Sequence, residues 1–177
     1  LRAAGECDND SDGSFFLGTQ GNGRSYTGNT LGVGNGATYR VGANDSAGST
    51  LTFSPVLTTS NVFTGANRLQ VGSLAVGGQG TVVLNTDNSH TGGTTVNQGV
   101  LDLNAQSGGT GAIRGAVTVN SGAELRSSGG GGAVFGYTAG QKIDTFAIIG
   151  GLIIGATGVN HVWNATLNMT GGEMRTN

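Results

Sequence analysis

Short stretches of alternating apolar and polar residues recur along the chain, and glycine, asparagine or serine separates each stretch from the next. In "TTVNQGVLDL" (94–103) a valine precedes the glycine and two leucines follow it. Three further segments have the same form: "LGVGNGATYRV" (31–41), "VTVNSGAEL" (117–125) and "ATLNMTGGEM" (165–174). Alternation with a period of two places every second side chain on one face, so each stretch predicts a short strand and each glycine a tight corner. In 31–41, for example, Leu31 and Val33 are expected to form one strand, and Tyr39 and Val41 the next.

The spacing of these segments indicates how the strands are arranged. The element "VN", followed by any residue and a glycine, occurs at Val96 and again at Val119. An antiparallel sandwich also consists of short alternating strands, but it usually carries more aromatic residues and lacks such a recurrence. A repeat of about 23 residues fits one rung of a right-handed parallel β-helix, whose rungs bury their apolar faces by stacking. We therefore expect an all-β chain of roughly seven or eight rungs with little or no helix.

The composition supports this fold and restricts the partners. Glycine provides 36 of the 177 residues and only 10% of the residues are charged, so helix propensity is low. The net charge is −2 and the eight basic residues are scattered, so we predict no nucleic-acid partner. The longest apolar run, 146–156, is much shorter than the roughly 20 residues that span a bilayer, which predicts no transmembrane segment. We interpret 146–155 as two fully buried strands joined at a Gly-Gly corner.

Two regions depart from the repeating pattern. Residues 1–20 are acidic, contain the single cysteine, Cys7, and are expected to form a lead-in or cap. Residues 21–177 are expected to form one β-helix domain, with 127–142 as a loop or protrusion. The sequence begins at Leu1 and shows no signal peptide, so we expect a mature or excised piece of a longer chain. Its open end rungs are expected to pair with another copy or with the remainder of a larger chain.

The best copy of the pattern, within 80–126, resembles a known repeat. Residues 80–103, "GTVVLNTDNSHTGGTTVNQGVLDL", are similar to the autotransporter-associated β-strand repeat, also called the passenger-associated transport repeat. Residues 116–126 look like the rung that follows it. Two positions depart from the usual pattern, since His90 replaces an aromatic residue and Thr86 a glycine. The residues that carry the resemblance are Gly80, Val82, Leu84, Asn88, Thr91, Gly92, Gly93, Thr94, Val96, Gly99 and Leu101.

The resemblance implies a β-helix in the secreted, surface-displayed passenger of a bacterial autotransporter or a large adhesin. In this interpretation the chain is a structural scaffold or stalk with an adhesive role, located outside the cell or on the bacterial surface. It is not an enzyme and requires no cofactor, and its partner is a host surface or a glycan. An alternative of another class is a fibre or sheath subunit whose copies stack end to end, because the low charge opposes association only weakly.

An acidic turn near the start is the candidate metal site. Asp8, Asp10 and Asp12, followed by Gly13, match the beginning of a calcium-binding loop, and alternating carboxylates on a tight turn suit Ca²⁺. A complete loop of this kind requires a bidentate glutamate at its twelfth position, where Thr19 stands. A calcium site and a solvated acidic turn therefore both remain open.

A weaker alternative is a β-helix that binds or cleaves carbohydrate. Asp102 and Glu124 are separated by nearly one repeat, so they are candidates for neighbouring rungs, with Arg114 and Arg126 nearby in the sequence. Paired carboxylates can act as general acid and base in glycoside hydrolysis. The simpler interpretation is that both acids occupy outward positions on alternating strands, and we predict no catalytic residue.

Overall fold

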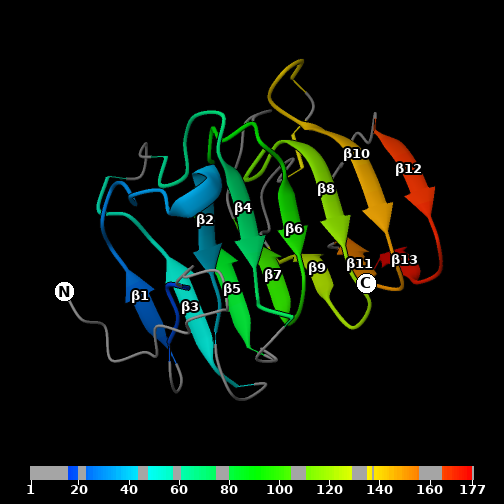
Figure 1. Cartoon of the computed structure of the whole chain (residues 1–177), viewed down its shortest axis with the longest axis horizontal. Helices are drawn as coiled ribbons and strands as arrows, with labels where there is room; N and C mark the ends of the chain where they lie inside the picture. The colour runs from blue at the N-terminus through cyan, green and yellow to red at the C-terminus, as the bar shows by residue number, and fades with distance from the viewer. Residues whose placement is uncertain are drawn as a thin grey trace.

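The chain forms a parallel β-solenoid of two sheets (Figure 1). The computed structural model describes residues 16–19, 23–43, 48–57, 61–74, 80–104, 111–128, 135–136, 138–155 and 165–176. The seven-stranded sheet contains, in spatial order, β1 (Arg24–Tyr26), β3 (Thr50–Phe53), β5 (Thr81–Leu84), β7 (Val100–Leu103), β9 (Glu124–Ser127), β11 (Leu152–Gly155) and β13 (Glu173–Thr176). The six-stranded sheet contains β2 (Thr38–Val41), β4 (Arg68–Val71), β6 (Thr94–Val96), β8 (Gly115–Val119), β10 (Ile143–Ile148) and β12 (Thr166–Met169).

Consecutive strands lie in different sheets, so one turn of the solenoid consists of one strand from each sheet. The corner that leads from the six-stranded to the seven-stranded sheet is tight in the middle of the chain, where residues 97–99 alone separate β6 from β7. Gly99 in this corner has a φ of +70°, a left-handed conformation that glycine adopts without a steric penalty. The described strands thus form six such pairs, preceded by β1.

The register between turns fixes their length. Val96 pairs with Val119, as the recurring sequence element predicts. Among the described strand pairs the shortest turn runs from Val82 to Leu101, and the longest runs from Leu51 to Val82. The predicted parallel β-helix is confirmed. The described residues form slightly fewer turns than the seven or eight expected, because several turns are longer than the spacing of the recurring element.

Inward-facing side chains align from turn to turn and form the core. One column in the six-stranded sheet, with members at most 1% exposed, consists of Val41, Val71, Val96, Val119 and Ile148. A column in the seven-stranded sheet, with members at most 4% exposed, consists of Leu51, Val82, Leu101, Leu125 and Ile153. Burying such a side chain contributes about 1.5–3 kcal/mol, and only a neighbouring turn can bury it. The solenoid is therefore stable as a stack and not as separate turns.

A third side without strands leads from the seven-stranded sheet back to the six-stranded sheet. The large buried side chains that it contributes include Phe63, His90, Ile113 and Phe135. The ring of Phe63 lies 4.9 Å from that of Phe53 and 5.1 Å from that of Tyr39, measured between centroids. The third side thus closes the core without hydrogen-bonded strands. Phe135 belongs to the segment 127–142, so this part of the predicted protrusion turns inward.

The strand expected at 31–33 is wrong. These residues lie in an irregular segment that leads into a 3₁₀ turn, η1 (Asn35–Ala37), which is the helical element among the described residues. Val33 is 45% exposed, while Leu31 packs against the core. Glycines occupy the positions between the apolar residues, and glycine favours loops as readily as corners, so the period of two was not diagnostic here.

The apolar run 146–155 forms two strands, as expected, although they are not fully buried. Phe146, Ile148 and Ile153 face the core, whereas Ile149 at the corner is 46% exposed and Leu152 faces outward. The outward face of a solenoid sheet meets solvent, so Leu152 is only half-buried, although Ile154 on the same strand is buried. Within the described part of the chain, no helix has the length and apolar character that crossing a membrane requires.

Candidate functional site

The two adjacent glycines of the "TGGT" segment bring three turns into close contact. A Cβ atom on Gly92 would lie 2.5 Å from the carbonyl oxygen of Asn67, on the preceding turn. Gly93 has a φ of +90°, and a Cβ atom there would lie 2.9 Å from the carbonyl oxygen of Ala116, on the following turn. Backbone from both neighbouring turns therefore occupies the space that side chains would need, which explains why both positions are glycine.

Asn88 connects the same three turns through its side-chain amide. Its Oδ1 accepts a hydrogen bond of 3.0 Å from the backbone N–H of Phe63, on the preceding turn. Its Nδ2 donates to the carbonyl oxygens of Thr86, within the same turn, and of Ala112, on the following turn, both at 3.1 Å. The residue is 1% exposed. Asn88 thus satisfies buried backbone groups on the strand-free third side, where no sheet is present to pair them.

A second amide ladder follows the tight corner between the sheets. Asn97 donates from Nδ2 to the carbonyl oxygen of Gly72 at 3.3 Å, and Asn120 donates to Oδ1 of Asn97 at 2.8 Å. These residues occupy equivalent positions on successive turns, so each bond crosses from one turn to the next. The repeated "VN" element was the sequence signal for this ladder, because it placed two asparagines 23 residues apart.

His90 occupies a closed apolar position on the third side. Its side chain is fully buried, and its ring meets that of Phe63 edge-on, with centroids 6.1 Å apart. Nε2 lies 3.0 Å from Oγ1 of Thr94, while Nδ1 is buried without a hydrogen-bond partner in the described structure. Burial lowers the pKa of His90 to about 4, and the positive charge of Arg114 acts in the same direction. His90 is therefore neutral in the folded protein near neutral pH.

We expect acid to destabilise the solenoid through His90. Between pH 6.5, its ordinary pKa, and about 4, its folded value, the unfolded chain binds a proton that the folded chain does not. The free energy of unfolding should therefore be highest above pH 6.5 and fall by about 3 kcal/mol as the pH approaches 4. Urea midpoints measured at about pH 7 and about pH 4.5 would show the loss, and His90→Gln should remove most of the difference. An unchanged difference in the His90→Gln variant would contradict this assignment.

Asn88, His90, Gly92, Gly93 and Asn97 lie in a segment that matches a known family. Residues 77–103 match the sequence model of the passenger-associated-transport-repeat. The chain carries a passenger repeat. No significant match was found among curated proteins or among solved structures.

The passenger repeat includes β5, β6, β7 and the third-side segment that joins β5 to β6. The resemblance predicted for 80–103 is thereby confirmed, and the repeat contains Gly92, Gly93 and Asn88. Its first described glycine, Gly80, is also held closely, because a Cβ atom there would lie 2.6 Å from the carbonyl oxygen of Ala43 on the preceding turn. Thr94 and Val96 face inward from β6 and Leu101 faces inward from β7. The passenger repeat is thus one closely fitted turn with contacts to both neighbours.

Asp102, one of the two candidate catalytic acids, has structural partners. It lies on the outward face of β7, opposite Arg126 of β9, and accepts a hydrogen bond of 2.8 Å from Arg126 Nε. Ser128 Oγ donates to its other oxygen at 2.6 Å. The register of this turn aligns Glu124 with Val100 and not with Asp102. Asp102 and Glu124 therefore both occupy outward positions on neighbouring strands, in agreement with the simpler of the two interpretations.

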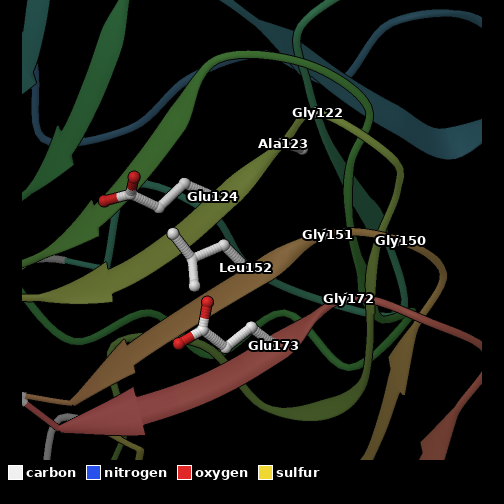
Figure 2. Close-up of a pocket in the computed structure, with 8 residues that line it drawn as sticks. All are labelled: Gly122, Ala123, Glu124, Gly150, Gly151, Leu152, Gly172 and Glu173. Carbon is white, nitrogen blue, oxygen red and sulfur yellow. The ribbon is translucent and has the colours of Figure 1, made fainter.

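An open groove of about 380 Å³ crosses the last three turns of the seven-stranded sheet. Figure 2 shows the carboxylates of Glu124 and Glu173 on the same side of the sheet, with the Leu152 side chain between them. Arg126 Nη1 lies 3.7 Å from Glu124 Oε1, and Arg175 Nη1 lies 3.7 Å from Glu173 Oε1. Two turns separate the carboxylates, about 10 Å at the usual strand spacing. The groove therefore offers an apolar centre between two ion-paired rims, and nothing in the sequence had indicated it.

The predicted calcium ligands, Asp8, Asp10 and Asp12, lie outside the described residues. Within the ranges that the structure describes, no group of three or more histidine, cysteine, aspartate or glutamate side chains is placed to hold a metal ion. Arg114, expected near the acids, lies close enough to His90 to influence its pKa.

Proposed function

We propose that the chain is a structural scaffold within the passenger of a secreted or surface-displayed bacterial autotransporter-like protein. The observation that supports this most is the passenger repeat itself, which forms a turn joined to both neighbours by Asn88. A turn of this kind binds the backbone before it and the backbone after it, so it provides a template on which the chain can stack as it emerges from a membrane. No bound group is needed for this role.

Display on a bacterial surface tests the scaffold function. The chain is placed ahead of an autotransporter translocator in a Gram-negative bacterium, and the surface-exposed fraction is measured by adding protease to intact cells. We expect Asn88→Ala to lower display severalfold, because it weakens the stacking of three turns. Asn104→Ala, which removes only the exposed bond from Asn104 Nδ2 to Asn85 Oδ1, is the matched control. Equal display of both variants would contradict the proposal.

We further propose that the adhesive part of this function lies in the groove around Leu152, with a glycan or host surface as the partner. The half-buried, outward-facing side chain of Leu152 between two Glu–Arg rims suits the apolar face and the hydroxyl groups of a sugar. Binding of the chain to a panel of immobilised glycans is the direct measurement, and Leu152→Glu should abolish it. Val100→Glu, in the same outward column but outside the groove, should leave it unchanged. A chain that binds no glycan would remove this part of the proposal.

A further inference from the structure

One exposed turn of the chain contains an asparagine followed directly by a glycine. Asn35 and Gly36 are the first two residues of η1, the coiled ribbon that leads into β2 in Figure 1. Both residues are exposed, as is Ala37, which completes the turn. Outside its chain neighbours, the single described atom within 4 Å of a Cβ position on Gly36 is Oγ1 of Thr38, at 4.0 Å. Solvent and the side chain of Asn35 can therefore both reach the peptide nitrogen of Gly36.

The peptide nitrogen of Gly36 is not used by the hydrogen bonds that hold the turn. Bonds in a 3₁₀ turn join residues three apart, so the first bond from the N-cap, Gly34, reaches the N–H of Ala37. Gly34 N–H donates to the carbonyl oxygen of Thr38 at 3.1 Å. Oγ1 of Thr38 donates to the carbonyl oxygen of Gly36 at 3.0 Å. The turn is thus fixed at both ends by bonds that leave the nitrogen of Gly36 available for reaction.

A charged side chain contacts the peptide group that contains this nitrogen. Arg40 of β2 donates a hydrogen bond of 2.8 Å from Nη1 to the carbonyl oxygen of Asn35. That carbonyl and the nitrogen of Gly36 form one peptide group, in which resonance shares electrons between oxygen and nitrogen. When the nitrogen loses its proton, negative charge moves onto the oxygen, where the guanidinium group stabilises it. The fold therefore places a cation where it makes the nitrogen of Gly36 a better nucleophile.

We propose that Asn35–Gly36 is a self-modification site, at which Arg40 promotes attack of the Gly36 nitrogen on Cγ of Asn35. The new bond between nitrogen and carbon closes a succinimide ring. The proton of the Gly36 N–H passes to a base in the solvent, and the side-chain amide group takes up a proton and leaves as ammonia. Water then opens the ring at one of its two carbonyl carbons, which gives aspartate or isoaspartate.

The product changes both the charge and the backbone of this turn. Aspartate and isoaspartate each place a carboxylate beside Arg40, with which it can form an ion pair. Isoaspartate also adds a methylene group to the main chain, between Gly34 and Thr38, which a backbone hydrogen bond joins. Because the reaction requires no enzyme, the modified fraction of the chains should rise with time after folding.

Two other described asparagines that precede a small residue are protected from the same reaction. Asn88 and Asn120 each precede a serine, whose side chain hinders approach to its own peptide nitrogen. The amide of Asn88 is buried and bonded to three backbone groups. The amide of Asn120 donates to Oδ1 of Asn97. Asn22 also precedes a glycine, but it lies outside the described residues.

Peptide mapping by mass spectrometry tests the modification. The purified chain is incubated under mildly alkaline conditions, and its peptides are analysed for conversion of amide to acid and for isoaspartate. We expect conversion at Asn35, while Asn88 and Asn120 keep their amides. Asn35→Gln should abolish the conversion at this position, because the longer side chain closes a ring much more slowly. If Asn35 kept its amide for as long as Asn120, the proposal would be overturned.

A second substitution tests the effect of the guanidinium group. Arg40→Gln removes the charge and should slow the conversion of Asn35 about threefold to tenfold. Arg68→Gln is the matched control, because it removes an exposed charge from the neighbouring strand β4, where Arg68 aligns with Thr38, and should leave the rate unchanged. Circular dichroism confirms that each variant is folded.

A synthetic peptide of residues 31–41 separates the effect of the fold from that of the local sequence. In the unfolded peptide the guanidinium group is not held against the carbonyl oxygen, so Arg40→Gln should leave the rate almost unchanged. Equal slowing in the peptide and in the folded chain would overturn the proposal, as would an unchanged rate in the folded Arg40→Gln variant. Equal slowing by Arg68→Gln would also overturn it, because the effect would then be one of overall charge.

Discussion

Asn88→Ala should cost about 3–5 kcal/mol of folding free energy, the largest loss that we expect from a single side chain here. The substitution leaves the N–H of Phe63 and the carbonyl oxygens of Thr86 and Ala112 without partners in a closed position. Each buried polar group left unpaired costs about 1–3 kcal/mol. Urea denaturation followed by circular dichroism measures the loss.

The matched control for this substitution is Asn104→Ala. Asn104 is also an asparagine on a turn, but the single described hydrogen bond of its side chain, to Asn85, is exposed, and we expect a change below about 0.5 kcal/mol. Similar losses for the two variants would show that the buried amide does not hold the turns together. A hydrogen-exchange measurement would then locate the bonds that do.

Gly92→Ala should cost about 1–3 kcal/mol, although it adds only one methyl group. The new Cβ would lie 2.5 Å from the carbonyl oxygen and 2.6 Å from the carbonyl carbon of Asn67. These are backbone atoms of the preceding turn, so relief requires that whole turns move apart. The same carbonyl accepts the hydrogen bond from Gly92 N–H at 2.9 Å, and the movement would stretch it. Thermal unfolding is a sufficient measurement.

Gly32→Ala separates this effect from a general effect of replacing glycine. Neither glycine has a left-handed φ, so backbone strain contributes to neither substitution. Gly32 has no atom within 4 Å of a Cβ position, and we expect its substitution to be neutral or slightly stabilising. If Gly92→Ala were equally harmless, the close approach of the turns would not limit stability.

The sequence predicted the sheets of the solenoid better than its third side. Around Val96 and Val119, apolar alternation, a corner glycine and the recurring "VN" element all indicate the same structure, and the strands lie where expected. The third side has no strand and no period, so nothing in the sequence showed that His90 would be fully buried. At Leu31 and Val33 the alternation alone predicted a strand and was wrong. The alternation at Tyr39 and Val41, in the same segment, does form a strand, so alternation alone did not distinguish a strand from a glycine-rich loop.

The outward-facing residues could be predicted only in part, because their neighbours depend on the length of each turn. The spacing of Asp102 and Glu124 suggested adjacent turns, and they do lie on adjacent strands. The register, however, places Arg126 and not Glu124 opposite Asp102. The residue opposite Asp102 is thus two positions further along the chain than expected, and the pair is an ion pair instead of two acids. Turns as unequal as the one from Val82 to Leu101 and the one from Leu51 to Val82 cannot be inferred from one recurrence.

The parallel register of both sheets has a mechanical consequence. Backbone hydrogen bonds between turns are slanted relative to the strands but run mainly along the axis of the stack. Tension applied along that axis loads the bonds of one turn at a time, so the rod yields by peeling from an end. A force along the strands would instead shear all the bonds of a turn together. Buried side-chain amides that bond across turns, such as that of Asn88, resist the separation of neighbouring turns. We therefore expect peeling to pause at the passenger repeat.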